Sequence, residues 1–265
     1  CPLKGNNTSS EWGEFSLRSV IASNGIRGYG LDADFITKIH PEFTNDGKLV
    51  EAIAYSPMRY LGKRSLKDQE INKLTLLEGM LLIDDQALMN NQLTKVTFPS
   101  TVKTIGVEAF AGNPLTTVTL LGSTPPNLGL NALPETVTDI VTFDESMAVY
   151  TKHKDWKVHA GKFKPISQAV GVLFESMSGK KGFLPGPVIT ASALVNNQAF
   201  ILSINGVTTL EGDALFGNYA NALTIPNSLT TVMGSALNIN AQILEFEEGR
   251  VDTAFMVDSR PDANV

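Results

Sequence analysis

Hydrophobic residues recur along this 265-residue chain at a spacing that fits neither one helix nor one strand. In the segment LTKVTFPSTVKTIGVEAFAGNP, residues 93–114, the apolar positions on either side of the proline are Leu93, Val96, Phe98, Val102, Ile105, Ala109 and Phe110. Moving 22 positions toward the N-terminus places Leu74 on Val96 and Ile83 on Ile105. The segment is therefore one copy of a repeat, and a repeat of this length predicts a solenoid.

Four such copies follow one another over residues 49–137. A second, shorter array is predicted over residues 200–246, where the 22-residue spacing returns from Val207 to Leu229. Between them, residues 138–199 show no repeat. The chain is thus expected to hold two arrays, either as one continuous solenoid or as two domains.

Each copy is expected to form one coil, in which a short strand with alternate residues inward meets a Pro or Gly turn and a second extended piece closes the loop. A single coil cannot bury its own apolar edge, so coils stack and cover one another. In this arrangement Phe110 plugs its coil, and Ala109 beside it fits the crowded site between coils. The predicted parallel strands of the first array are centred near Ala52, Leu74, Val96 and Val118.

Two segments, LTKVTFPSTVKTIG and VKTIGVEAFAGNPLTTVTL, resemble the BspA-type leucine-rich repeat in its Leu-x-x-Val-x-x-Pro, Val-x-x-Ile-Gly and Ala-Phe-x-Gly elements. The resemblance is close over residues 93–137 and fair over residues 49–92 and 200–246. One difference is Asn113, which stands where the family usually has a cysteine. The resemblance implies a β-rich solenoid of right-handed coils of about 22 residues, with short strands and few short helices. It also implies a bacterial surface or secreted protein with a role in adhesion or binding, many such proteins coming from gut commensals.

Residues 136–166 resemble the segment that often closes these arrays, an extended strand followed by a short helix that carries Tyr150 and Trp156. A solenoid must hide its last open edge under an atypical unit, so we expect Trp156 to pack on Leu133. The alternative is that Tyr150 and Trp156 form a platform on which a sugar stacks.

The predicted organisation has five parts. They are a flexible tether (1–11), an N-terminal capping region (12–48), the first array (49–137), the array-closing strand and helix (138–167), and a second region with the shorter array (168–265).

Cys1 is the one cysteine in the chain, so a disulfide framework is excluded. A polar stretch follows it, and the arrangement resembles a processed bacterial lipoprotein in which the cysteine carries the acyl chains. The expectation is therefore an exported protein at the cell surface or outer membrane that touches the membrane only through a lipid on Cys1. The alternative is that the sequence merely happens to begin at this residue.

The chemistry of the chain does not predict an enzyme. Lys and Arg total 21 against 27 Asp and Glu, and no basic cluster offers the stripe that nucleic acid requires. The histidines His40, His153 and His159 have no Cys or carboxylate at the spacing of zinc ligands. No Gly-x-Ser-x-Gly elbow occurs. We therefore expect no metal, no cofactor and no catalysis, the alternative being a hydrolase with a site at the junction of the two halves.

The outward positions of the strands predict a candidate binding face. If Val96 and Phe98 point inward, Thr97 between them faces outward. The 22-residue spacing then forms three rows, which are Thr75, Thr97 and Thr119; Lys73, Lys95 and Thr117; and Asn72, Thr94 and Thr116. Such a face suits a host or bacterial surface protein or a glycan, whereas the alternative is that threonine simply suits exposed strand positions.

Overall fold

The computed structural model describes the backbone of residues 51–54 and residues 59–191, 193–194 and 197–249. Contacts divide the chain into two compact units, one up to Ile166 (unit 1) and one from Ser167 onward (unit 2), and each unit is described by itself. Within the described ranges, no helix has the length and apolar character needed to cross a membrane.

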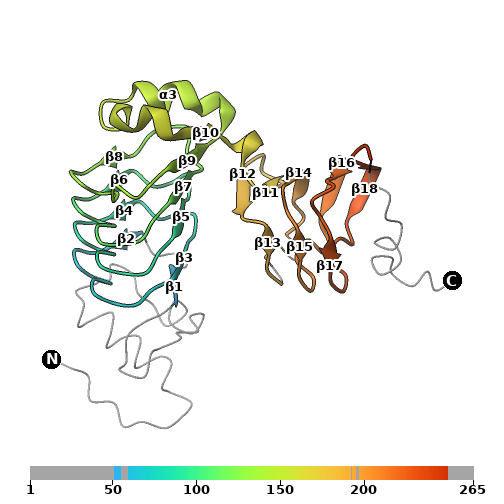
Figure 1. The fold of residues 1–265 in the computed structure, drawn as a ribbon, viewed down its shortest axis with the longest axis horizontal. Coiled ribbons are helices and arrows are strands. Elements are labelled where there is room, and N and C mark those ends of the chain that lie inside the picture. Colours follow the sequence, from blue (N-terminus) through green and yellow to red (C-terminus); the bar gives the residue numbers. More distant parts are fainter. Residues whose placement is uncertain (1–50, 55–58, 192, 195–196, 250–265) are drawn as a thin grey trace, which may run out of the picture. The chain divides into compact units, whose positions relative to one another are not determined.

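Unit 1 is a stack of coils, and each coil contributes one long and one short strand on opposite sides of the stack (Figure 1). The long strands are β1 (Glu51–Ala54), β3 (Lys73–Leu76), β5 (Lys95–Phe98), β7 (Thr117–Leu120) and β9 (Asp139–Thr142). The short strands are β2 (Tyr60–Leu61), β4 (Leu82–Ile83), β6 (Thr104–Ile105) and β8 (Asn127–Leu128). All the strand pairs formed among these elements are parallel, so the predicted β-rich solenoid is confirmed.

The repeat spacing sets the strand register in unit 1. Ala52 lies opposite Leu74, and Val96 lies opposite Val118, as the repeat predicted. The inward side chains form one continuous buried cluster through the stack. Phe110 is fully buried in it, and its ring meets the ring of Phe98 edge-on at a centroid distance of 5.4 Å. The predicted role of Phe110 as an inward plug is confirmed.

Asn113 links two coils instead of merely replacing a cysteine. Its side-chain oxygen accepts a hydrogen bond from the Leu93 backbone N–H at 3.0 Å, and its amide donates to the carbonyls of Leu88 and Phe110. Asn91 occupies the equivalent place one coil earlier and is likewise buried. Buried polar backbone groups must find partners, so these asparagines satisfy the turns where coils meet.

The closing segment of unit 1 contains α3 (Met147–Lys152), the 3-10 turns η1 (Asp144–Ser146) and η2 (Lys157–Lys162), and β10 (Phe163–Pro165). β10 pairs with β9 in parallel and extends the sheet of long strands. The helix was expected to carry Trp156, and this prediction is wrong. The helix ends at Lys152 because His153 adopts an extended backbone with ψ 139°, so Trp156 lies in the turn that follows.

Trp156 and Tyr150 are buried core residues. Both are 0% exposed and belong to the same buried cluster as Leu133. The Trp156 indole N–H donates to the Pro126 carbonyl at 2.8 Å, and its ring packs edge-on against the rings of Tyr150 and Phe163. The alternative that these aromatics form a sugar-stacking platform is therefore wrong.

Unit 2 is built from similar coils, but its larger sheet begins with an antiparallel hairpin. Its larger sheet has the order β12 (Lys181–Pro185), β11 (Gly171–Glu175), β14 (Phe200–Asn205), β16 (Tyr219–Ile225) and β18 (Asn240–Phe246). Its smaller sheet has the order β13 (Val188–Ile189), β15 (Thr209–Leu210) and β17 (Thr231–Val232), and a 3-10 turn, η3 (Ile166–Gln168), lies at the unit boundary. An antiparallel hairpin of β11 and β12 opens the larger sheet, after which β14, β16 and β18 run parallel.

The sequence pattern placed the start of the second array at residue 200, but in the structure the coils of unit 2 begin earlier. Val188 pairs with Thr209 and Ile189 with Leu210, so each partner lies one position nearer than the repeat spacing requires. Leu194 is buried and its N–H donates to the Ala214 carbonyl. Because this coil is one residue shorter than its neighbours, a comparison at the repeat spacing does not align it.

Candidate binding face

The structure brings the predicted face together on β5 and β7. Lys95 lies opposite Thr117, and Thr97 lies opposite Thr119, in one parallel register. β3, with Lys73 and Thr75, lies beside β5 in the stack (Figure 1). Neighbouring strands of a sheet are about 4.8 Å apart, so the rows offer one side chain per coil at that interval.

Thr119 departs from the expectation of a fully accessible row. It is 1% exposed, whereas Thr97 beside it and Thr75 one coil earlier are half-buried. Its register partner on the other side is Val141 of β9, which is also buried at 5% exposed. The side of the sheet toward the closing segment is therefore apolar and covered, and the accessible part of the face lies on β3, β5 and the start of β7.

Hydroxyls in and beside the third row, Asn72, Thr94 and Thr116, form hydrogen bonds between coils. The Thr116 hydroxyl donates to the Thr94 carbonyl at 3.2 Å, and the Thr138 hydroxyl donates to the Thr116 carbonyl at 3.4 Å. These hydroxyls bridge consecutive coils, which is the structural role that exposed strand threonines often have. This row is thus a weaker contact candidate than the row that contains Lys95.

The lysines give the face a local positive charge within an acidic chain. Lys73 and Lys95 are both exposed. At the far end of their row, Asp139 forms an ion pair with Lys164 at 2.6 Å, so the carboxylate there is already compensated. The face therefore presents ammonium and hydroxyl groups, which suit an acidic or hydroxyl-rich ligand.

On the short-strand side, polar groups are used within the stack. Arg64 donates to the Gln86 side-chain oxygen at 2.6 Å, and Gln86 donates in turn to Glu108 at 2.6 Å. The Val107 N–H donates to Asp85 at 2.9 Å, and this hydrogen bond lowers the pKa of the Asp85 carboxyl. These side chains tie coil to coil, so they leave fewer groups for a ligand than the long-strand side does.

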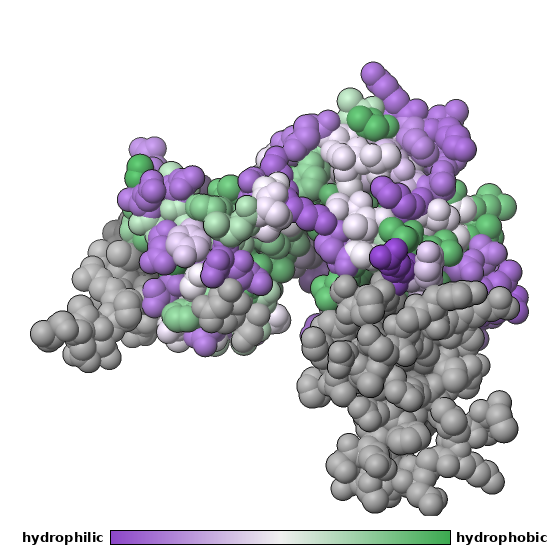
Figure 2. Space-filling view, turned by 180° about the vertical axis from the view of Figure 1, so that it is seen from behind, coloured by the Kyte–Doolittle hydropathy of each residue, from purple (hydrophilic) through white to green (hydrophobic). Residues whose placement is uncertain are grey.

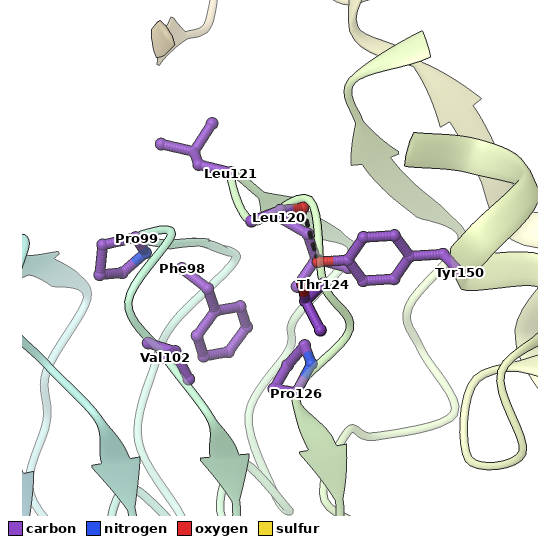
Figure 3. A pocket seen from close by; sticks show the side chains of 9 residues that line it. Phe98, Pro99, Val102, Leu120, Leu121, Thr124, Pro126 and Tyr150 are labelled. Carbon is purple, nitrogen blue, oxygen red and sulfur yellow. Dashed lines mark hydrogen bonds between the residues drawn. The ribbon is translucent and has the colours of Figure 1, made fainter. Parts of the chain in front are cut away.

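A small pocket lies between the last coils and the closing segment of unit 1 (Figure 3). Its lining residues are Phe98, Pro99, Val102, Leu120, Leu121, Gly122, Thr124, Pro126 and Tyr150. The Tyr150 hydroxyl donates to the Gly122 carbonyl at 3.0 Å, and burial raises the pKa of Tyr150, which keeps the hydroxyl protonated. The space has room for about one water molecule. It is a small gap in the packing between the closing segment and the coils, and it is too small for a ligand.

The sequence singled out other groups whose places can now be given. Within residues 59–191, 193–194 and 197–249, no three His, Cys, Asp or Glu residues gather in a way that could hold a metal ion. The rings of His159 and Trp156 lie at a centroid distance of 6.2 Å. Burial lowers the pKa of His159, and the positive charge of nearby Lys162 lowers it further. Cys1 and His40 lie outside the described residues.

Sequence reasoning missed a second surface, on unit 2. The rings of Phe200 and Tyr219 lie side by side on β14 and β16, with a centroid distance of 5.7 Å and an angle of 36°. Tyr219 is 36% exposed. The two residues are closer in sequence than one full repeat, so a search at the repeat spacing does not pair them. Apolar residues also interrupt the hydrophilic surface on the side of the molecule that Figure 2 displays.

Residues 36–139 match the family model described as the BspA type Leucine rich repeat region, in six copies. The match includes residues 93–137, whose motifs carried the resemblance. No curated protein matches the chain.

Three solved structures resemble the chain at low identity. A leucine-rich repeat protein from Eubacterium ventriosum ATCC 27560 is 15% identical with a TM-score of 0.31, and the match covers 74% of this chain and 55% of that one. A leucine rich cell surface protein from Faecalibacterium prausnitzii A2-165 is 15% identical with a TM-score of 0.24, over 75% and 42%. The pneumococcal vaccine antigen PcpA is 11% identical with a TM-score of 0.27, over 83% and 74%. The chain thus spans about half the length of the first two.

Proposed function

We propose that this chain, whose residues 36–139 match the BspA-type leucine-rich repeat family, is a non-catalytic binding module on a bacterial cell surface. Its contact surface is the face that β3, β5 and β7 build in unit 1. The supporting observation is the in-register pair of rows in which Lys95 adjoins Thr117 and Thr97 adjoins Thr119. A stack of coils repeats similar chemistry at every strand, which suits an extended partner better than a small reacting centre.

The chemistry of this face defines the ligand class. Exposed ammonium groups on Lys73 and Lys95 attract carboxylate, sulfate or phosphate groups, and the Thr97 hydroxyl can both donate and accept a hydrogen bond. The partner is therefore a surface protein or glycan with acidic or hydroxyl groups along an extended stretch. Because the attraction is largely electrostatic, its strength falls as salt is added.

The test is a triple variant of the face, Lys73→Glu, Lys95→Glu and Thr97→Arg, screened against arrays of host-matrix proteins and glycans. We expect binding seen with the wild type to fall by about tenfold or more, since charge reversal replaces attraction with repulsion. The matched control carries Lys103→Glu, Lys154→Glu and Thr104→Arg, which make the same charge changes away from this face. Equal binding by both variants and the wild type would move the contact surface elsewhere.

The anchoring part of the proposal concerns Cys1. We propose that this thiol carries lipid in the native host, which holds the module at the membrane surface. The precursor with Cys1→Ser should then move from the membrane fraction to the soluble or released fraction. A variant that still sediments with membranes and resists extraction by salt would contradict lipid attachment at this residue.

A further inference from the structure

Unit 2 carries an exposed surface that differs in chemistry from the face on unit 1. It is formed by two residues from each of β14, β16 and β18, and we name it the aromatic–carboxamide face. Its residues are Phe200, Leu202, Tyr219, Asn221, Asn240 and Gln242.

The strand geometry turns these six residues away from the core. Between the two face residues of each strand lies one inward residue, namely Ile201, Ala220 or Ala241. Ile201 and Ala220 are 1% and 2% exposed, and Ala241 packs against the same buried cluster. Successive residues of a strand point to opposite sides, so their neighbours lie on the outer side of the sheet.

The first row of the face joins two rings and an amide. Phe200 lies opposite Tyr219, and Tyr219 lies opposite Asn240. The two rings are in contact, and Tyr219 is 36% exposed. The rings therefore form a small apolar platform with the Asn240 carboxamide beside it.

The second row supplies further amides. Leu202, which is 40% exposed, follows Ile201 at a bulge of β14, where the register with β11 shifts. The exposed residues Asn221 and Gln242 follow the register partners Ala220 and Ala241 on the next two strands. In the part of the chain that the structure describes, the side chains of Asn221, Asn240 and Gln242 make no hydrogen bond. Each carboxamide thus keeps both a donor and an acceptor for a ligand.

The six positions hold no Asp, Glu, Lys or Arg, although residues 168–265 as a whole hold nine Asp and Glu against four Lys and Arg. Beyond Phe200 in the first row, Glu175 of β11 lies opposite Lys181 of β12, so two opposite charges adjoin there. A charged partner would meet no opposite charge on these positions, whereas the lysines of unit 1 would attract acidic ligands. The chemistry of the two surfaces is therefore different, and a neutral ligand suits the six positions of this one.

We infer that the aromatic–carboxamide face binds a neutral oligosaccharide. The C–H face of a pyranose ring is apolar and packs on the exposed ring of Tyr219, while the hydroxyls at the ring edge exchange hydrogen bonds with carboxamides, which both donate and accept. An aromatic platform with amides along one side fits an extended, uncharged sugar chain. A peptide strand would instead pair with the backbone groups of an edge strand, whereas this face is built from side chains that point outward from the sheet.

This site is separate from the face on unit 1, so either can fail without the other. The test measures binding of the purified chain to maltohexaose, cellohexaose, mannohexaose and xylohexaose by calorimetry and NMR titration, with polygalacturonate as the charged comparison. We expect at least one neutral hexamer to bind. We expect Tyr219→Ala to raise its dissociation constant by about tenfold, as for a central aromatic contact. Asn221→Ala should raise it by about threefold to tenfold, as for one lost hydrogen bond.

Two variants serve as controls. Tyr219→Phe keeps the ring and should change the dissociation constant by no more than about threefold. Tyr60→Ala removes a tyrosine of nearly equal exposure, 37%, from unit 1, and should leave binding unchanged. Circular dichroism checks that each variant is folded. Binding of none of the neutral hexamers at millimolar concentration, or equal binding by Tyr219→Ala and Tyr60→Ala, would overturn the assignment, as would a preference for polygalacturonate at this face.

Discussion

The two units use the same kind of coil but finish it differently. In unit 1, β10 pairs with the last long strand of the stack, and Tyr150 and Trp156 lie in the core at 0% exposed. In unit 2, β18 is the outermost strand of its sheet within residues 167–249, and Leu244 on it is 39% exposed. The difference shows that a coil buries its own inward residues only when another element covers it.

One pair of leucines isolates this effect. Leu223 on β16 and Leu244 on β18 are register partners at the same inward position. Leu223 has a strand on each side and is 2% exposed, whereas Leu244 has a strand on one side only within the described residues. Residue type, strand direction and position are shared, so the covering neighbour accounts for the difference in burial.

Removing the side chain that closes unit 1 should have the largest effect on stability. Trp156→Ala should lower the free energy of unfolding by about 3–5 kcal/mol, because it empties a buried site and leaves the Pro126 carbonyl without its donor. Chemical denaturation measures the loss, and hydrogen exchange should show β8 and β9 losing protection first. The control is Val158→Ala, at a side chain that is 75% exposed in the same segment. A loss no larger than in the control would mean that the segment does not hold the stack.

A smaller effect tests what the two units share. Asn113 in unit 1 and Asn218 in unit 2 are both buried, and they join three and four backbone groups, respectively, by hydrogen bonds. Replacing either by Ala should cost about 1–3 kcal/mol of unfolding free energy, since buried backbone groups lose their partners. Exposed Asn72→Ala should change stability by less than about 0.5 kcal/mol. A large loss at one asparagine and none at the other would show that the coils are not equivalent.

Much of the fold could be predicted from the sequence because a strict spacing defines neighbours. Where the repeat keeps its regular spacing, as from Val96 to Val118, the predicted register is the observed one. The spacing does not predict the register where a coil is one residue shorter, so the pairing of Val188 with Thr209 was not predicted. The helix through Trp156 was also misjudged, since helical spacing of apolar residues does not reveal that the backbone turns extended at His153.

The surfaces were harder to predict than the fold. Alternation along a strand gives the direction of Thr119 but not what covers it, and its burial became visible only in three dimensions. Phe200 and Tyr219 are brought together by a register shorter than the repeat, which depends on the length of the intervening loop. Asn113 could be recognised as an exception to the family pattern, but its three hydrogen bonds depend on which carbonyls the turn leaves free.

Two leucines at the same inward position of unit 2 allow a matched test of the covering strand. Leu223→Ala should cost about 2–5 kcal/mol of unfolding free energy, as for a buried leucine, whereas Leu244→Ala should cost about 1 kcal/mol or less, because its side chain already meets water. Both variants remove the same atoms from the same inward position of adjacent strands, so the difference between the losses measures the contribution of the covering strand. The measurement is chemical denaturation at two protein concentrations about tenfold apart, which reveals any contribution from association. Equal losses at the two leucines would mean that β18 is covered in solution, and a loss at Leu244 that grows with concentration would identify a second copy of the chain as the cover.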